Sequence, residues 1–397
     1  MGAVVFAISF LAAAAGFVLA SFLALETLAA FLPARRREAA KAGPIAVVIP
    51  AHNEAASIAA TLANVRSQLR PEDRVIAVAD NCTDDTAARA RAAGAEVVER
   101  NDPARRGKGY ALQFALDHVR AAPPAIVVFT DADCAFADGA LLRVAGVAAA
   151  AERPAQALYL MKAPAESGPR LKVAAFAWAF MNHVRMRGLQ RLFDVTRFTG
   201  AGFAAPWSVI ESADLASGEI VEDLALTFQL ARKGAPPLLV ADAVIESEFP
   251  TGEEALTRQA ARWSIGSMRY AARASLSALS DGVMRGKPAL IGAAVDLMIP
   301  PLTIFMAALF AAAALGAVAW IWTGDATPFL LAVWALLLTA TSIVAGWHGF
   351  GRDALPPEAL HGAFDFLLSK LNVFGAAGRR SASGWTPTRG GDSEGKQ

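Results

Sequence analysis

The chain has 397 residues, of which 55% are hydrophobic and 18% charged, and its formal net charge at pH 7 is +1. Globular proteins typically have about 25% charged residues, so this composition excludes a disordered or wholly soluble protein. The near-zero net charge gives no indication of a nucleic-acid partner. The two cysteines, Cys82 and Cys134, exclude a disulfide framework and a cysteine-rich zinc site, and they fit a reducing compartment.

The first element in chain order is an apolar stretch over residues 3–32, whose only charged residue is Glu26. It exceeds the roughly 20 apolar residues that cross a membrane. Arginines and a lysine follow it directly, at positions 35–41. A cleaved signal peptide is the alternative, but the stretch has no basic residues before it and is too long for one. We therefore predict a transmembrane helix over residues 1–33.

Residues 43–285 alternate short β-branched runs with segments of helical periodicity. We expect strands at 45–49, 75–79, 97–99 and 126–130, and helices at 54–69, 86–93 and 109–119. This alternation predicts an α/β domain with a mostly parallel, Rossmann-like sheet covered on both faces. Such sheets bind ligands beyond the carboxyl ends of their strands. Polar residues follow three of the expected strands there, at 52–54, 80–82 and 131–133.

Asp131 and Asp133 lie two residues apart at the end of a strand, so both side chains point to one side of an extended chain. Paired carboxylates suit Mg²⁺ or Mn²⁺, which substrate phosphates then help to coordinate. A solvated acidic loop is the alternative. Asp80, at the end of another strand, can accept hydrogen bonds from a base or ribose. Residues 84–86 are better explained as N-capping groups of the next helix.

Two turns contain glycine beside polar residues. Residues 105–110 read Arg-Arg-Gly-Lys-Gly-Tyr and precede a helix. Glycine permits close backbone approach, and a helix start beside Lys108 favours a phosphate, although a solvated basic loop has the same composition. Residues 198–203 read Phe-Thr-Gly-Ala-Gly-Phe. This second turn fits a plain tight turn as well as a backbone that approaches a ligand.

Two further patterns lie on expected helices. Glu222 and Asp223 begin a helix, where acidic residues are common because of the helix dipole. A catalytic base that faces a cleft would occupy the same kind of place. Gln259, Arg262 and Trp263 share one helix face, where an amide, a guanidinium and an indole can hold a diphosphate and stack a sugar. An interfacial helix with a snorkelling arginine is the alternative for this pattern.

Two more apolar stretches follow within residues 290–349, and a short connector without Lys or Arg joins them. They predict a transmembrane helical hairpin, whose first span lies at about 291–322. Basic residues follow the first and the last apolar stretch. The positive-inside rule therefore places residues 43–285 and the C-terminus in the cytoplasm. An interfacial amphipathic helix at 356–376 and a flexible cytoplasmic tail at 377–397 complete the expected order.

Taken together, these motifs resemble those of the membrane-bound family 2 glycosyltransferases, the group that contains the cellulose, chitin, hyaluronan and poly-N-acetylglucosamine synthases. The resemblance rests on residues 50–54, Asp80, residues 107–109, 131–133, 198–202 and 222–223, and Gln259-x-x-Arg262-Trp263. It implies a GT-A fold and an inverting transfer from a UDP-sugar that depends on Mg²⁺ or Mn²⁺. It also implies a multi-pass protein of the inner (plasma) membrane, in contact with membrane lipid, with its catalytic domain in the cytoplasm.

The resemblance implies a role for each motif residue. Asp223 would be the general base, and Asp133 would coordinate the metal. The residues that would bind the nucleotide sugar are Glu54, Asp80, Lys108, Asp131, Gln259, Arg262 and Trp263. The residues that would bind the acceptor are Thr199, Gly200, Gly202, Glu222 and again Trp263.

The acceptor stays open at this point, because the expected membrane helices are fewer than the large processive synthases use for a polymer channel. A lipid-linked or glycolipid acceptor and a growing polysaccharide are both consistent with the sequence, the latter if chains associate with partner subunits or with each other. A catalytically idle, nucleotide-binding membrane subunit is an alternative, against which the intact Asp133, Asp223 and Arg262 argue. A transporter is disfavoured, since the apolar stretches offer no charge pair beyond Asp296.

Overall fold

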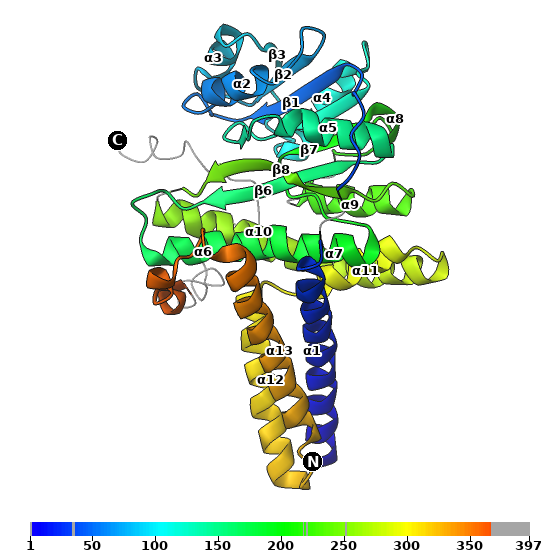
Figure 1. Cartoon of the computed structure of the whole chain (residues 1–397), viewed down its shortest axis with the longest axis vertical. Coiled ribbons are helices and arrows are strands. Elements are labelled where there is room, and N and C mark those ends of the chain that lie inside the picture. Colours follow the sequence, from blue (N-terminus) through cyan, green and yellow to red (C-terminus); the bar gives the residue numbers. More distant parts are fainter. Residues whose placement is uncertain (1, 34–35, 217, 220, 251, 367–397) are drawn as a thin grey trace.

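The structure is a computed structural model that describes residues 2–33, 36–216, 218–219, 221–250 and 252–366. Figure 1 shows an α/β head, a layer of roughly horizontal helices below it, and a stalk of long helices. The stalk contains α1 (Gly2–Ala30), α12 (Leu302–Thr323) and α13 (Thr327–Gly346). The stalk is thus formed by helices from both ends of the described chain, and the residues between α1 and α12 form the head and the helical layer.

Within the described residues, the head is built on one eight-stranded sheet. Its strands are, in spatial order, β3 (Glu96–Arg100), β2 (Arg74–Asp80), β1 (Ile45–Ala51), β4 (Ile126–Phe129), β7 (Phe203–Pro206), β6 (Ala155–Lys162), β8 (Leu238–Glu248) and β5 (Ala135–Phe136). The first four run parallel, β7 is antiparallel to both neighbours, and β6 and β8 pair in parallel. The predicted α/β fold is confirmed.

The central strand β1 shows why these segments form strands. Successive side chains of residues 45–49 face two different core clusters, one on each face of the sheet, and all are at most 1% exposed. A strand buried on both faces needs apolar side chains throughout, which is the pattern expected of parallel sheets. The helices packed around the sheet are α2 (Ile58–Arg66), α3 (Thr86–Ala92), α4 (Lys108–Val119) and α5 (Ala140–Ala151).

A layer of helices separates the sheet from the stalk (Figure 1). Its members are α6 (Pro169–Ala179), the π-helix η1 (Phe180–Arg185), α7 (Met186–Phe193), α9 (Glu222–Arg232), α10 (Glu253–Met284) and α11 (Pro288–Met298). The chain also forms three short helices, α8 (Trp207–Ile210), η2 (Trp347–Gly351) and η3 (Pro357–Ala359). The layer also meets the stalk closely, because a Cβ added at Gly188 of α7 would lie 2.0 Å from the Glu26 carbonyl oxygen of α1.

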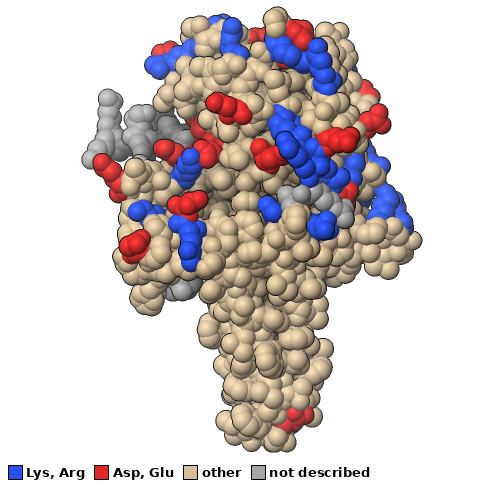
Figure 2. Space-filling view, viewed as in Figure 1, with Lys and Arg blue, Asp and Glu red and all other residues tan. Residues whose placement is uncertain are grey.

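Three helices in the described part of the chain are long and apolar enough to cross a membrane, Gly2–Ala30, Leu302–Thr323 and Thr327–Gly351. Figure 2 shows the charged side chains gathered on the head and the helical layer, while the stalk surface in this view is almost free of them. Such a surface suits a lipid environment, where charged groups are costly.

The apolar stretch expected at 291–322 contains two helices, not one. α11 ends at Met298, and α12 starts at Leu302, beyond Pro300 and Pro301. Proline has no amide hydrogen and cannot continue a helix, so the chain turns there. Of the interfacial helix predicted at 356–376, residues 362–366 are helical. Pro357–Ala359 form the separate short helix η3, and residues 367–376, like the tail predicted at 377–397, lie outside the described residues.

Candidate active site

A cavity of about 980 Å³ extends from the carboxyl ends of the parallel strands into the helical layer. Residues at or just beyond the carboxyl ends of β1, β2 and β4 line it, so three distant parts of the sequence meet at one edge of the sheet, as its topology requires. Of the predicted site residues, those that line the cavity are Glu54, Asp80, Lys108, Asp131, Asp133, Thr199, Gly200, Glu222, Asp223, Gln259, Arg262 and Trp263. Gly202 is buried and does not line the cavity.

Lys108, the first residue of α4, joins two parts of the site. Its ammonium pairs with the Asp131 carboxylate and donates a hydrogen bond of 2.7 Å to the Gly200 carbonyl oxygen. Burial alone would lower the pKa of Lys108, but the charges of Asp131, Glu222 and Asp223 outweigh burial and raise it. The ammonium is therefore charged at neutral pH and draws the β4 end and the glycine turn together.

The turn at 199–202 has a backbone that glycine makes possible. Gly200 has a φ of +90° and Gly202 a φ of +73°, in the region that other residues rarely adopt. A Cβ added at Gly200 would lie 3.7 Å from Lys108 Nζ and 3.8 Å from Asp223 Oδ2. The turn therefore lies between the ammonium and the carboxylate.

Glu222 and Asp223 form an acidic pair at the start of α9. Burial and then the charge of Asp223 raise the pKa of Glu222 to about 7. Burial also raises the pKa of Asp223, against the opposing effects of a 2.8 Å hydrogen bond from the Leu224 N–H and of the Lys108 charge. Carboxylates with raised pKa values in a cleft are suited to accept a proton from a hydroxyl group.

Asp131, Asp133 and Cys134 place one candidate ligand atom each within 4.8 Å of one another. Burial raises the pKa of the Cys134 thiol well above its ordinary value, so it stays protonated at neutral pH. Its Sγ–H donates to Asp133 Oδ1 at 3.6 Å. The two carboxylates are thus the groups suited to a divalent cation, and hard oxygen donors fit Mg²⁺ or Mn²⁺.

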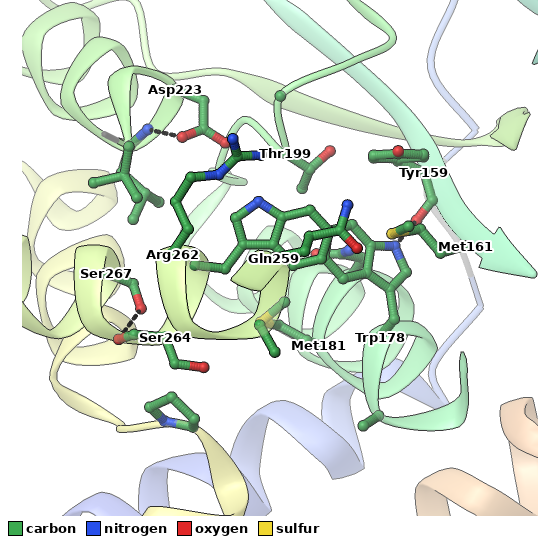
Figure 3. A pocket seen from close by; sticks show the side chains of 18 of the residues that line it. Tyr159, Met161, Trp178, Met181, Thr199, Asp223, Gln259, Arg262, Ser264 and Ser267 are labelled. Atoms are coloured by element: carbon green, nitrogen blue, oxygen red, sulfur yellow. Dashed lines mark hydrogen bonds between the residues drawn. The ribbon is translucent and has the colours of Figure 1, made fainter. Parts of the chain in front are cut away.

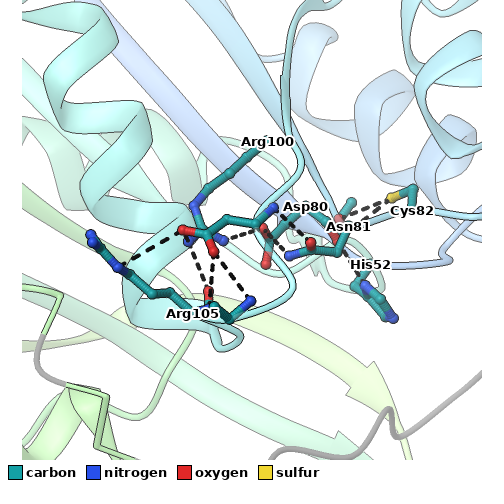
Figure 4. A network of polar contacts seen from close by, with 9 residues as sticks. His52, Asp80, Asn81, Cys82, Arg100 and Arg105 are labelled. Atoms are coloured by element: carbon teal, nitrogen blue, oxygen red, sulfur yellow. Dashed lines mark hydrogen bonds and ion pairs between the residues drawn. The ribbon is translucent and has the colours of Figure 1, made fainter.

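Asp80 is held at the end of β2 by the polar network in Figure 4 and is only 5% exposed. Arg100 Nη1 donates to Asp80 Oδ1 at 2.6 Å, and Asn81 Nδ2 donates to the same oxygen at 2.9 Å. Burial raises the pKa of Asp80, and Arg100 opposes this rise. Arg100 carries no motif in the sequence, and its only signal is its place at the end of the neighbouring strand, directly opposite Asp80.

Arg262 extends from α10 toward the side of the cavity where Asp223 and Thr199 lie (Figure 3). Burial lowers the pKa of Arg262, while the charges of Glu222 and Asp131 oppose that shift. A buried guanidinium beside carboxylates is well placed to bind a diphosphate when one displaces those partners.

Trp263, next to Arg262, belongs to an aromatic cluster. Its ring packs on Trp178 of α6 with the centroids 4.8 Å apart, and Trp178 contacts Tyr159 edge to face at 5.4 Å. Trp178 Nε1 also donates to the Tyr159 carbonyl oxygen at 3.0 Å. Tyr159 also lines the cavity, although a single tyrosine in β6 carries no motif that could predict this.

A buried charge cluster lies beside the cavity. Arg185 of η1 donates to Asp296 Oδ1 at 2.6 Å, and Arg197 Nε lies 2.9 Å from Asp296 Oδ2. Glu26 of α1 completes the cluster, with Oε2 at 3.5 Å from Arg185 Nε. Both arginines line the cavity. The sequence showed Glu26 and Asp296 as isolated charges in apolar stretches, so their shared partners are a finding of the structure.

The family model described as glycosyltransferase-like family 2 matches residues 42–266. The solved mannosyltransferase PcManGT from Pyrobaculum calidifontis, in complex with GDP-Man and Mn²⁺, is 21% identical with a TM-score of 0.54, covering 87% of this chain and 99% of that one. This likeness shows a shared fold.

The glucosyl-3-phosphoglycerate synthase of Mycobacterium tuberculosis is 43% identical over 103 residues, which are 24% of this chain. The match spans about a third (31%) of that curated relative. A solved structure of the M. tuberculosis synthase with UDP is 22% identical, with a TM-score of 0.36, and covers 53% of this chain and 72% of that one.

The family model covers more than half of the chain and contains the carboxylates at the strand ends, Lys108, the glycine turn and the acidic pair. The sheet and its covering helices have the GT-A fold of this family. The chain therefore belongs to glycosyltransferase-like family 2 and is a glycosyltransferase.

Proposed function

We propose that the protein is an inverting, metal-dependent glycosyltransferase that moves a sugar from a UDP-sugar to an acceptor held at the membrane. The observation that supports this proposal is the contact made by Lys108, which joins Asp131 to the Gly200 turn beside Asp223. The product would be an envelope glycan, an exopolysaccharide or a glycolipid.

The donor would occupy the strand-end side of the cavity. Glu54 and Asp80 would contact the uridine, whose base and ribose offer hydrogen-bond donors to carboxylates. Lys108, Gln259 and Arg262 would bind the diphosphate. Asp133, with Asp131 beside it, would hold Mg²⁺ or Mn²⁺, an ion that neutralises charge on the departing diphosphate when it is bound.

The chemistry is a single displacement. The acceptor oxygen forms a bond to the anomeric carbon of the sugar, the bond from that carbon to UDP breaks, and the hydroxyl proton passes to Asp223. One base is sufficient for this step, and the configuration inverts because there is no covalent intermediate. Arg262 stabilises the negative charge that develops on the leaving diphosphate. Trp263 and the turn at 199–202 would position the acceptor.

We propose an inner-membrane location with the stalk in lipid and the head in the cytoplasm. The catalytic unit would comprise residues 43–285, between an N-terminal span within 1–33 and a hairpin within 290–349. The apolar stalk and the charged head support this arrangement. The basic residues after the first span support the cytoplasmic side.

UDP release tests the proposal. The full chain in lipid nanodiscs would be incubated with UDP-glucose, UDP-N-acetylglucosamine or UDP-galactose, with Mn²⁺ or Mg²⁺ and a membrane-lipid extract as the acceptor source. We expect release from one sugar, lost on chelation and lowered at least about 100-fold by Asp223→Asn, with UDP affinity retained. Asp117→Asn, at an exposed carboxylate of α4, is the matched control.

A fully active Asp223→Asn variant would contradict the role of Asp223 as the general base. Absence of UDP binding would contradict a UDP-sugar as the donor. UDP binding without turnover of any sugar would favour the idle subunit. Product size and extraction into organic solvent would then separate a glycolipid from a polysaccharide.

A further inference from the structure

The cavity continues beyond the glycine turn to the helices of the stalk. We call this part the apolar arm. It is lined by Phe176, Met181, Ile299, Leu302, Met306 and Ile343. These residues come from α6 and η1, from the segment before α12, and from α12 and α13. The donor and base residues of the proposed reaction lie at the other end, so that reaction leaves the arm unexplained.

The arm lies at the junction between the head and the stalk. Met306 is near the start of α12 and Ile343 near the end of α13, and both helices are apolar enough to cross a membrane. Figure 1 places these helix ends next to the helical layer. A cavity that joins a polar chamber to an apolar wall at this level suits a molecule with a polar head and a hydrocarbon chain.

Three residues that line the same cavity have buried polar atoms without partners. Among the described residues, Asn182 Nδ2, Thr199 Oγ1 and Gln259 Oε1 are buried without a hydrogen-bond partner, and all three residues line the cavity. Asn182 is 3% exposed and lies in the π-helix η1, between the fully buried Phe180 and Val184. Unpaired buried polar groups are costly, and π-helical turns often mark functional sites. These atoms are suited to an uncharged hydroxyl group.

The arginines closest in sequence to Asn182 and Thr199 are already engaged. Arg185, three residues after Asn182, and Arg197, two residues before Thr199, both bind Asp296. A lipid phosphate would have to compete with that buried carboxylate. A phosphate acceptor also carries its own negative charge and needs no base, whereas a hydroxyl acceptor needs one.

We propose that the acceptor is an uncharged, hydroxyl-bearing lipid, whose hydrocarbon chain occupies the apolar arm and whose head-group hydroxyl is bound by Asn182 and Thr199. This inference rests on the proposed glycosyl transfer and names its acceptor class. The lipid oxygen bonds to the anomeric carbon, UDP leaves, and the proton passes to Asp223. The product is an uncharged glycolipid.

Photo-labelling tests the apolar arm without any UDP-sugar. The full chain in phosphatidylcholine nanodiscs would be irradiated with an alkyl-diazirine diacylglycerol, which has one free hydroxyl. We expect labelled peptides from α6–η1 and α12. Met306→Trp, which fills the arm, should reduce labelling at least about fivefold. Leu315→Trp, at a 46% exposed position of the same helix, should leave labelling unchanged.

Competition identifies the head group. Unlabelled dioleoylglycerol should abolish labelling, and undecaprenyl phosphate should not. Asn182→Leu, similar in size but unable to donate, should weaken competition by dioleoylglycerol about fivefold and leave UDP affinity unchanged. Asn182→Gln should restore part of that affinity. Equal labelling of Met306→Trp and Leu315→Trp, or equal competition by undecaprenyl phosphate, would overturn the inference.

The two proposals fail in different ways. If the lipid binds as expected but no sugar is turned over with dioleoylglycerol, the glycosyl transfer is wrong and the lipid site stands. If UDP release proceeds in Met306→Trp at the parent rate, with the same acceptor, the transfer stands and the lipid site is wrong.

Discussion

Glu222 titrates near neutral pH because burial and the adjacent Asp223 both disfavour its charge. Its pKa of about 7 lies above the ordinary value of 4.5 for an unfolded chain. Between these two values the folded protein binds more protons than the unfolded protein, so this group makes the free energy of unfolding fall as pH rises from about 4.5 to 7.

Glu222→Gln removes this titration. We therefore expect the melting temperature of the variant to fall less between pH 5 and pH 8 than that of the parent chain, both measured without nucleotide or metal. Asp117→Asn should behave like the parent. An identical pH dependence in Glu222→Gln would show that the carboxylate is not held near neutrality by burial.

The two glycines of the acceptor turn differ in what surrounds them. A Cβ at Gly202 would lie 2.6 Å from Ile245 Cγ2, while the contacts at Gly200 are of ordinary length. We expect Gly202→Ala to lower the free energy of unfolding by about 2–3 kcal/mol and Gly200→Ala by about 1 kcal/mol. Thermal unfolding measures this order, and a larger loss in Gly200→Ala would contradict it.

The ion pair between Arg100 and Asp80 links the end of β3 to the proposed uridine site. Arg100→Met leaves Asp80 buried without its guanidinium, which moves the Asp80 pKa further upward from a value that burial already raises. UDP affinity should therefore fall between pH 8 and pH 6 more steeply in Arg100→Met than in the parent, measured by calorimetry. Arg74→Met, which removes a half-buried partner of Glu96, is the control.

At the scale of whole elements, strands buried on both faces could be predicted, because β1, β2 and β4 contain uninterrupted apolar runs. The strands β5, β6, β7 and β8 were not predicted. In β8, Asp242 and Glu246 interrupt the apolar residues, and the register with β6 shifts between Ala157 and Leu158. A strand with charged residues and an irregular register has no clear period in the sequence.

The motifs at strand ends could be predicted because parallel topology brings strand ends together. The residues that these motifs contact could not be predicted. Lys108 meets Asp131 only because α4 begins at that point of the sheet edge, and Asn182 reaches the cavity only because α6 continues through a π-helix. Both depend on tertiary packing, for which the local sequence carries no signal.

The ion pairs of the buried charge cluster connect α1, η1 and α11, and removal of the Asp296 carboxylate should destabilise the packing of these three helices. Asp296→Asn leaves two buried arginines without their shared carboxylate and should lower the free energy of unfolding by about 3–5 kcal/mol. Arg185→Met and the double variant complete a thermodynamic cycle. We expect the losses to be non-additive by more than about 1 kcal/mol. Additive losses would mean that the two side chains do not interact.

At the scale of the whole molecule, the stalk predicts a fixed orientation in the membrane. Asp325, in the connector between α12 and α13, should face the outside, and Asp117 of α4 should face the cytoplasm. In a chain with Cys82 and Cys134 replaced by alanine, a membrane-impermeant maleimide added to intact cells should label Asp325→Cys and not Asp117→Cys. Labelling of Asp117→Cys and not of Asp325→Cys would mean that the protein has the opposite orientation in the membrane.

The single cavity that runs from the strand ends to α12 and α13 has a kinetic consequence. A donor that enters from water is governed by its bulk concentration, whereas an acceptor that enters from the bilayer is governed by its mole fraction among the lipids. Diluting the acceptor with inert phospholipid, at constant total acceptor, should therefore slow turnover. The turnover rate would therefore depend on the two-dimensional concentration of the acceptor in the membrane and on the three-dimensional concentration of the nucleotide sugar in solution.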